Sequence, residues 1–467
     1  MKKVLKVLLS ALMVLTVAVS TALPVKAATH IDAVYIYVER PQVGKMPNYD
    51  NSIQSEPQHD SMRKRTLIEW YESDDNNMDH ARKMEATDHF QEGKFYHVKY
   101  GSVVLQDPDA VIDDKTKFYI NQETVEGKSM RFYLGKQLIR IYGNNRYTTS
   151  FEISHTMIQD FMQMSEGLHN VFITSGTNFA DALAVSYAAK HNYGPIIVVN
   201  ENNQDMVAQY LFDHFYEPAS TVYIIGGKNA VPEKLEKKLA KEFMTVKRIA
   251  GNNRYETNLA ILEEFGVYNS DTLLVATGTN FADSLSAAAT GLPLMLVKGD
   301  DITDNQLAFM FENSFDKIYI LGGEKAVSKG IEDTLSDFAP VTRIAGNNRY
   351  ETSKKIAEEF FKECEVVFLA YGGNFPDGLC GGPLAGLEEG PLLLVNEENY
   401  SYGRAYVKAH SEIKYGVAFG GTGVLSDKVF RKVLRERSDA IIHEENYEIF
   451  DLNHFFGGLK RLGYSPY

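Results

Sequence analysis

Two hydrophobic patterns divide the chain near residue 135. Before this point, apolar and polar residues alternate over short runs, a pattern that predicts β-strands with one buried face. The clearest runs lie at residues 33–38, 95–100 and 117–120. Clusters of Gly, Pro and Asp separate the runs, and helical turns are expected around residues 78–90. We therefore predict a small, mainly-β domain over residues 28–135.

Further along the chain, helical stripes alternate with uninterrupted apolar strands. In the segment 246–340, one stripe is formed by Tyr255, Leu259, Leu262 and Phe265. Apolar strands follow at residues 273–276, 293–297 and 317–321, with helices expected around residues 305–315 and 329–338. Strands that lack alternation and are separated by helices form parallel sheets covered on both faces. The pattern predicts doubly wound, Rossmann-like α/β modules.

Three sequence blocks recur in this second part, always in the same order. The first reads RIYGNNRYTT from Arg140, and RIAGNNRYET from Arg248 and from Arg343. The second reads GTNFADAL from Gly176, GTNFADSL from Gly278 and GGNFPDGL from Gly372, and the third is an apolar strand ending in Gly-Gly. A period of about a hundred residues is the size of a small domain, so one module is used three times. The modules are expected at residues 136–245, 246–340 and 341–467, the last with a C-terminal tail.

The first residues predict export. Lysines precede an apolar run from Val7 to Val19, and the small residues Ala27 and Ala28 offer a cleavage site, as in a secretory signal peptide over residues 1–27. The run is shorter than the roughly 20 residues of a membrane-spanning helix, although an uncleaved anchor is the alternative. The net charge of −14 argues against general binding of nucleic acid or anionic lipid.

The GNNRY turn is the first candidate binding element. Because Gly and Asn favour tight turns and Asn caps helices, Arg146, Arg254 and Arg349 are placed in a first helical turn. The helix dipole disfavours a cation there, so the arginine needs an anion nearby. That anion could be the matched aspartate of the same module, which would make the arginine structural, or it could be a polyanionic ligand. The sequence leaves both interpretations open.

The GxNFxD block is the second candidate element. It follows a strand and begins a helix, which places it at the carboxyl edge of the sheet, where ligands bind in open α/β folds. Its Asn amides could meet sugar hydroxyls or only the local backbone. The resulting candidate polymer-binding residues are Asn145, Arg146, Asn178, Asp181, Asn253, Arg254, Asn280, Asp283, Asn348, Arg349, Asn374 and Asp377. The third copy contains Pro376 and Gly378, so its helix is expected to begin differently.

Catalytic and cofactor signatures are missing from the sequence. Neither GxGxxG nor a Walker pattern occurs, which argues against a nucleotide site, and plain strand-to-helix turns explain the Gly-Gly pairs. HExxH, GxSxG and metal-type Cys/His clusters are also missing. Each module offers one matched Asp, whereas glycan hydrolysis uses a pair of carboxylates. We therefore expect no catalytic residue, no metal site and no cofactor.

The three blocks resemble the cell-wall-binding repeat 2 family of Firmicutes surface proteins, which usually carries three tandem copies. The resemblance covers about residues 140–440 and implies three Rossmann-like modules in a pseudo-threefold arrangement. It also implies non-covalent attachment to the cell wall through an anionic secondary polymer, often beside a surface layer. The N-terminal domain would then be the variable effector region, and residues 90–98 resemble accessory β-sandwich domains of Gram-positive surface proteins.

These observations together predict a secreted protein of the Gram-positive cell surface. Its three repeats are expected to bind an anionic wall polysaccharide, with surface-layer proteins as further partners. No nucleic-acid partner and no membrane span are expected. Two other functions stay open, namely a cell-wall hydrolase or amidase modifier and a structural component of a surface layer. An enzyme would have to use the N-terminal domain, which shows no catalytic signature.

Overall fold

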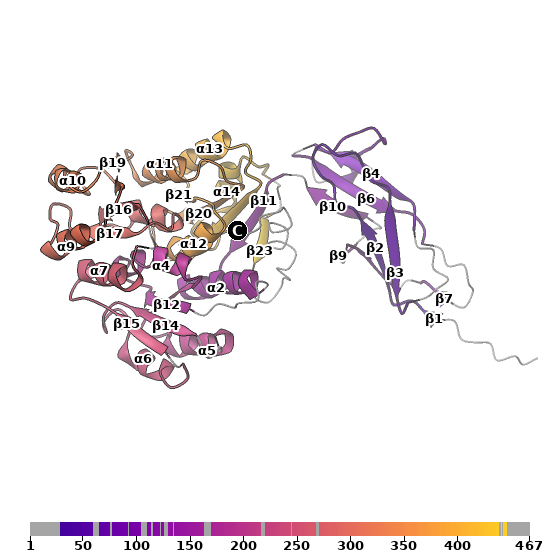
Figure 1. Cartoon of the computed structure of the whole chain (residues 1–467). Helices are drawn as coiled ribbons and strands as arrows, with labels where there is room; N and C mark the ends of the chain where they lie inside the picture. The colour runs from indigo at the N-terminus through magenta and orange to yellow at the C-terminus, as the bar shows by residue number, and fades with distance from the viewer. Residues whose placement is uncertain are drawn as a thin grey trace, which may run out of the picture. The chain divides into compact units, whose positions relative to one another are not determined.

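The computed structural model describes residues 29–445 except 59–64, 75–76, 92, 104–109, 114, 122, 126–128, 134, 163–169, 216–219, 244, 268–269, 439 and 441. The expected signal peptide and the residues after 445 lie outside the described residues. The chain folds as two compact units, Met1–Leu134 and Gly135–Tyr467. Figure 1 labels the helices and strands of both units.

Two sheets share one core in the N-terminal unit. The first consists, in order, of β3 (Asn51–Glu56), β2 (Ala33–Val38), β8 (Lys117–Ile120) and β9 (Glu123–Thr124). The second consists of β10 (Ser129–Tyr133), β6 (Phe95–Tyr100), β4 (Ile68–Ser73) and β5 (Arg82–Lys83), while β1 (Thr29–His30) pairs with β7 (Ala110–Val111). Val34 and Ile36 of one sheet and Trp70 and Val98 of the other are fully buried in the same cluster. The alternating pattern therefore predicted β2, β6 and β8 with their observed bounds.

The helical turns expected around residues 78–90 are wrong, except for the 3₁₀ helix η1 (Met78–His80). The polar side chains of this segment fix turns instead. The Asp88 carboxylate accepts a 2.8 Å hydrogen bond from the backbone N–H of Glu85 and a 2.7 Å bond from the Arg82 guanidinium. Asp side chains that bond nearby backbone groups compete with helical bonding in this way.

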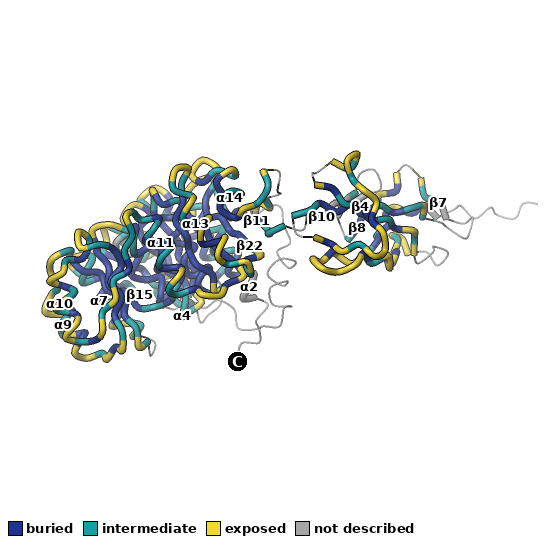
Figure 2. The backbone as a smooth tube through the Cα atoms, turned by 90° about the horizontal axis from the view of Figure 1, so that it is seen from above, coloured by how far each residue is buried: buried dark blue, intermediate teal, exposed yellow. Residues whose placement is uncertain are grey.

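Each module of the C-terminal unit contains a parallel sheet whose strands are separated by helices. The first module has α2 (Arg146–Met162), β12 (Asn170–Ser175), α3 (Ala180–Leu183), α4 (Ser186–His191), β13 (Ile196–Val199), α5 (Gln204–His214), β14 (Thr221–Ile225), α6 (Glu233–Leu239) and β15 (Thr245–Ile249). The second has α7 (Arg254–Phe265), β16 (Thr272–Thr277), α8 (Ala282–Leu285), η2 (Ser286–Ala289), β17 (Leu294–Val297), α9 (Asp304–Glu312), β18 (Lys317–Leu321), α10 (Lys329–Ser336) and β19 (Val341–Ile344). The third has α11 (Arg349–Phe360), β20 (Val366–Tyr371), α12 (Pro376–Leu387), β21 (Leu392–Val395), α13 (Tyr400–Ala409), β22 (Tyr415–Phe419), α14 (Asp427–Leu434) and β23 (Ile442–Glu445). The strands form the buried interior, and exposed residues lie on the helices and loops around them (Figure 2).

The strand that opens each repeat completes the sheet of a different module. The first two sheets have the orders β13-β12-β14-β15 and β17-β16-β18-β19, so the RIxG strand of the next repeat is their last member. The third sheet has the order β21-β20-β22-β11-β23, in which β11 (Gln137–Ile141) comes from the beginning of the unit. β11 is parallel to both β22 and β23. The first strand of the unit thus closes the module ring.

A cluster of phenylalanines marks the pseudo-threefold centre of the ring. The helices that follow the GxNFxD blocks contact one another there. The rings of Phe179, Phe281 and Phe375 form a triangle with centroid separations of 5.7, 6.0 and 6.0 Å. These tilted and edge-to-face geometries are favourable for aromatic pairs. The repeated phenylalanine therefore holds the three modules together.

Small residues let the central helices approach closely. Gly378, Gly382 and Gly386 are spaced four apart on α12 and so share one face. A Cβ at Gly382 would lie 2.6 Å from the Cβ of Ala288, and one at Gly386 would lie 2.5 Å from the Ala289 carbonyl oxygen. Larger side chains would force the modules apart.

The expectation that the third central helix begins differently is wrong. α12 begins at Pro376, and the equivalent helices begin at Ala180 and Ala282 in the same block. Proline is well tolerated at the first helical position because its missing N–H is not needed there. The difference lies at the other end, since α12 continues unbroken to Leu387 whereas the other two are divided.

Candidate functional site

The carboxyl ends of the central strands bring the repeated blocks together. In the second module, β17 and β18 lie on opposite sides of β16, so the topological switch point lies between the ends of β16 and β18. The GTN loop and the Gly-Gly turn follow these two strands. The Asp283 carboxylate fills the space between them, because a Cβ at Gly322 would lie 2.6 Å from its Oδ2.

The GNNR turn of the next module packs at the same place. Asp283 accepts a hydrogen bond from the Thr352 side chain and lies within the electrostatic influence of Arg349, both on α11. We use the word junction for this combination of the GxN loop and Gly-Gly turn of one module with the GNNR turn of the next. The same blocks recur at the other two boundaries, with the first module following the third.

The second asparagine of each GNNR turn is a helix cap. Asn253 has extended backbone, and its Oδ1 accepts from the N–H groups of Tyr255 at 2.9 Å and Glu256 at 3.1 Å. Asn348 makes the same pair of bonds, and Asn145 does so at the start of α2. These three oxygens are occupied by the fold. The amide nitrogen of Asn253 donates to Glu256 at 2.8 Å, and that of Asn348 donates to the Tyr402 hydroxyl at 3.4 Å.

The three arginines share one contact, and two of them share a second. Nη1 of Arg146, Arg254 and Arg349 donates to a carbonyl oxygen of the GxN loop in the same module, at 2.7, 2.5 and 2.6 Å. The guanidinium of Arg254 also lies 5.5 Å from the centre of the Phe179 ring, and that of Arg349 lies 5.2 Å from the Phe281 ring. Each of these rings belongs to the preceding module.

The structural interpretation of the arginines must therefore be corrected. It assumed an ion pair with the aspartate of the same module, but the aspartate beside Arg349 is Asp283 and the one beside Arg146 is Asp377. Both aspartates belong to the module that precedes the arginine's own module in the ring, because α2, α7 and α11 each pack against that preceding module. Among the described side chains, the three guanidinium groups form no ion pair within 4.0 Å.

The aspartates of the junctions are held in a desolvating environment. Burial raises the pKa of Asp377 to about 6, although the charge of Arg146 opposes the shift. Burial also raises the pKa of Asp283, against the Thr352 hydrogen bond and the Arg349 charge. The side chain of Asp181 lies outside the described residues. Near pH 6, Asp377 is therefore only partly ionised and neutralises Arg146 only in part.

The asparagines of the GxN loops lie on the outer rim of the junctions. Asn178 and Asn280 are exposed and Asn374 is half-buried. The side-chain oxygen of Asn280 accepts from Ala282 N–H at 3.1 Å, and that of Asn374 accepts from Phe375 N–H at 2.9 Å. Their amide nitrogens point away from these caps and are the groups that could meet a ligand.

Glycine is required in the GxN loop because a tyrosine ring covers it. A Cβ at Gly176, Gly278 or Gly372 would lie 2.4–2.6 Å from the ring of the tyrosine that follows the repeated arginine. The Arg-Tyr pair of one block thus clamps the glycine of the other, with the guanidinium on its carbonyl oxygen and the ring on its Cα. This contact explains why the two blocks recur together.

The role of the first arginine of each repeat was not predicted from its sequence block. Arg248 donates to the Gly226 carbonyl oxygen at 2.7 Å and to Glu236 at 2.8 Å, and Arg343 makes equivalent bonds to Gly322 and Glu332. Arg140 makes the third such set of bonds, to the Gly420 carbonyl oxygen and to Asp427. Recurrence of the arginine was the available signal, but a strand residue gives no indication of its partners. The repeated phenylalanine was missed for the same reason.

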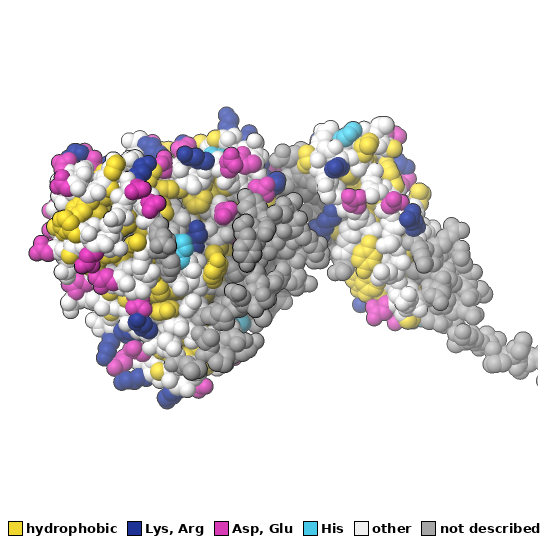
Figure 3. All heavy atoms as spheres, viewed as in Figure 1, with side chains coloured by type: hydrophobic (Ala, Val, Ile, Leu, Met, Phe, Trp, Pro, Cys, Tyr) yellow, Lys and Arg dark blue, Asp and Glu magenta, His cyan; other side chains and the backbone are white. Residues whose placement is uncertain are grey.

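On the face shown in Figure 3, acidic and basic side chains are interspersed over the C-terminal unit. Among the described residues, three or more His, Cys, Asp or Glu side chains never gather in a way that could hold a metal ion. Within the same residues, every helix is too short or too polar to cross a bilayer.

Comparison with known protein families agrees with the repeated blocks. The family model described as cell wall binding domain 2 (CWB2) matches residues 140–236, 248–332 and 343–430. The family resemblance predicted from the three blocks is thereby confirmed.

Two curated proteins of Bacillus subtilis are similar over part of their length. The chain is 26% identical to the N-acetylmuramoyl-L-alanine amidase LytC over 62% of this chain and 56% of the amidase. It is 28% identical to an amidase enhancer over 56% of this chain and 35% of the enhancer. The chain therefore spans about half or less of the length of these relatives.

Two solved structures from Clostridium difficile share the fold. Cwp8 superposes with a TM-score of 0.57 at 18% identity, covering 74% of this chain and 59% of that protein. Cwp6 gives the same TM-score and identity, covering 87% of this chain and 69% of that protein. These likenesses confirm the predicted fold class of repeated α/β modules with a small β-rich region before them.

Proposed function

Because the chain belongs to the cell wall binding domain 2 family, it is a cell-wall-associated protein, and we propose that its three junctions bind an anionic secondary wall polymer. In this proposal the protein is secreted and held on the Gram-positive surface without a covalent bond. The N-terminal unit would be displayed by this anchor, and surface-layer proteins would be its neighbours.

The state of the three arginines is the observation that supports the proposal. Each guanidinium is half-buried, each donates to a backbone carbonyl, and none has a described carboxylate within ion-pair distance. A guanidinium has five N–H donors, so several remain for a phosphate or carboxylate group. A net charge of −14 makes such local cationic positions the favourable places for a polyanion.

Three equivalent sites on one rigid frame suit a repeating polymer. Once one segment of the polymer binds, the next site meets a high effective concentration of the same chain. Individually weak, charge-assisted contacts can then give firm attachment. The exposed amide of Asn280 would add hydrogen bonds to sugar hydroxyls beside the charged contact.

The test is sedimentation of the full chain with purified cell walls. The variant Arg146→Gln/Arg254→Gln/Arg349→Gln keeps a donor for each loop carbonyl and removes three charges. Its control is Lys234→Gln/Lys241→Gln/Lys362→Gln, which removes three exposed charges away from the junctions. We expect the arginine variant to bind at least about tenfold more weakly and with a shallower salt dependence, while the lysine variant binds like wild type.

Two further results complete this test. Walls stripped of phosphodiester-linked polymers with hydrofluoric acid should lose most of their capacity for the wild-type chain. Circular dichroism and thermal unfolding establish that the arginine variant is folded. A folded arginine variant that sediments as well as wild type at every salt concentration contradicts the proposal.

A further inference from the structure

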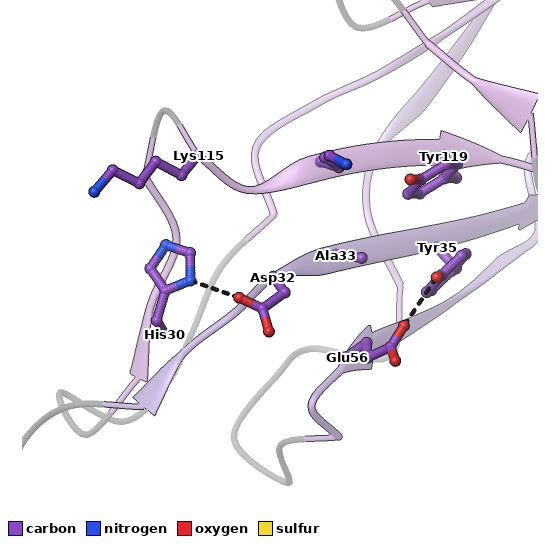
Figure 4. A pocket seen from close by; sticks show the side chains of 8 residues that line it. His30, Asp32, Ala33, Tyr35, Glu56, Lys115 and Tyr119 are labelled. Atoms are coloured by element: carbon purple, nitrogen blue, oxygen red, sulfur yellow. Dashed lines mark hydrogen bonds and ion pairs between the residues drawn. The ribbon is translucent and has the colours of Figure 1, made fainter.

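A shallow groove lies on the outer face of the first sheet of the N-terminal unit, and its volume is about 650 Å³ (Figure 4). Along β2 the residues Val34, Ile36 and Val38 point into the core, so Ala33, Tyr35 and Tyr37 point outward. Pairing with β3 and β8 places Glu56 and Lys117 on either side of Ala33. The small Ala33 is the floor of the groove.

Two tyrosines form one side of the groove. Tyr35 and Tyr119 are directly opposite each other on β2 and β8, and their rings stack with centroids 4.9 Å apart at 15°. Both side chains are half-buried, so part of each ring surface meets solvent. The Tyr35 hydroxyl donates to Glu56 Oε2 at 3.1 Å, which fixes the ring and the carboxylate together.

Charged side chains of both signs form the other side. His30 is hydrogen-bonded to Asp32 at 3.1 Å and to Asp113 at 2.9 Å, and Figure 4 shows it beside Lys115 at the open end. Lys117 and Glu56 supply one donor group and one acceptor group next to the floor. The groove thus has balanced charge, unlike a site for a polyanion.

We infer that this groove binds a neutral polysaccharide chain, with a sugar ring over Ala33 and against the tyrosine pair. The apolar C–H face of a sugar ring matches an aromatic surface, and its hydroxyls both donate and accept hydrogen bonds. Mixed carboxylate and ammonium groups at the edge of an aromatic platform supply both partners. The groove volume is within the range of small-ligand sites.

This site shares no residue with the junctions, and its affinity should depend little on salt. Neutral sugars bind without releasing counterions, so affinity should persist in 0.5 M NaCl, where charge-assisted binding is weakened. The occupant is a glycan and not an extended peptide, because β2 is already paired on both sides and offers no free backbone edge. A second wall contact through the N-terminal unit would follow from this chemistry.

The experiment is isothermal titration calorimetry of the full chain in 0.5 M NaCl. The probes are oligomers of N-acetylglucosamine, oligomers of glucose, and glycan strands from walls freed of anionic polymers and stem peptides. We expect at least one probe to bind with a Kd below about 1 mM. Tyr119→Ala should weaken that binding about tenfold or more, since it removes half of the platform.

A variant that fills the groove separates binding from stability. Ala33→Leu keeps both tyrosines and all charges but places a larger side chain on the floor, so it should abolish binding. Ser52→Leu adds an apolar side chain to an exposed position of the same face, opposite Tyr37, and should leave binding unchanged. Both variants should keep the near-ultraviolet circular dichroism of the wild type.

The inference is overturned if none of the three probes binds, or if Ala33→Leu binds like wild type. Binding of isolated stem peptides in place of the sugars also overturns it. Failure of the junction proposal would leave this result unaffected, because the arginine variant retains the groove and can be titrated in the same way.

Discussion

Replacing Arg140 by Met should loosen the closure of the module ring. Arg140 is completely buried in β11, where Nη1 donates to the Gly420 carbonyl oxygen at 2.6 Å and Nη2 to Asp427 at 3.0 Å. The guanidinium also lies 5.7 Å from the centre of the Phe430 ring. Burial lowers the pKa of this arginine, and the Asp427 charge opposes that shift. Methionine would keep the aliphatic packing and remove only the polar contacts.

The expected loss in the free energy of unfolding follows from the two hydrogen-bond partners of Arg140. A hydrogen bond that involves a charged group contributes about 1.5–3 kcal/mol, and the Gly420 carbonyl would be left unpaired at a further cost of about 1–3 kcal/mol. Asp427 is 38% exposed, so its contribution is reduced because water can replace the lost partner. We expect a loss of about 3–5 kcal/mol in the free energy of unfolding, measured by equilibrium urea denaturation.

Amide hydrogen exchange shows which strands lose stability in Arg140→Met. Amides of β11 and β22 should exchange faster in Arg140→Met, because their pairing joins the first and last parts of the unit. Arg343→Met is the matched control: it removes equivalent bonds to Gly322 and Glu332 within the second sheet. It should cost a similar free energy but leave β22 protected. A loss below 1 kcal/mol, or unchanged exchange in β11 and β22, would refute the reasoning.

Three further outcomes can be checked by thermal or urea unfolding. Phe281→Ala should cost about 2–4 kcal/mol by opening the central triangle, whereas Phe311→Ala, at a residue that is 79% exposed, should cost less than about 0.5 kcal/mol. Gly372→Ala should cost about 1–3 kcal/mol, because its Cβ would lie 2.4 Å from the Tyr350 ring, and an unchanged melting temperature would disprove the clamp. The pKa of Asp377 is raised to about 6, so the stability linked to its protonated form is full below pH 4 and is lost as the pH rises through 6. Asp377→Asn should therefore stabilise the chain by about 1–3 kcal/mol at pH 7 and have little effect at pH 4, and a destabilised variant at pH 7 would contradict this sign.

Local patterns were sufficient to predict most of the elements. The segment 246–340 shows why: α7, β16, β17, β18 and α10 all lie within a few residues of the bounds that hydrophobic periodicity indicates. Buried parallel strands are uniformly apolar, and helices show stripes, so each element is visible within a short window. The same argument holds for β2, β6 and β8, whose alternation reflects a sheet with one face in the core.

Contacts between residues that are distant in the sequence could not be predicted from local patterns. The pairing of β11 with β22 joins residues that are far apart, and β11 alone resembles the equivalent strands β15 and β19. Its amino acids indicate a strand but not which sheet it joins. The partners of the junction arginines are hidden for the same reason, because Asp283 and Asp377 act on the following module and not on their own. The error about these pairs came from assuming that a repeat is self-contained.

The junctions also give the repeated arginines a second task that a single module cannot provide. Arg254 and Arg349 complete a clamp in their own module and cover a phenylalanine of the preceding one. In the proposed function, the positive charge is useful because the nearby aspartate belongs to another module and is too distant to form a tight ion pair. A ring of three modules has three such junctions, whereas two modules in tandem would have one. Polymer binding should therefore depend on closure of the ring through β11. Because Arg140 stabilises this closure, replacing it should weaken adhesion to the wall as well as lower the free energy of unfolding.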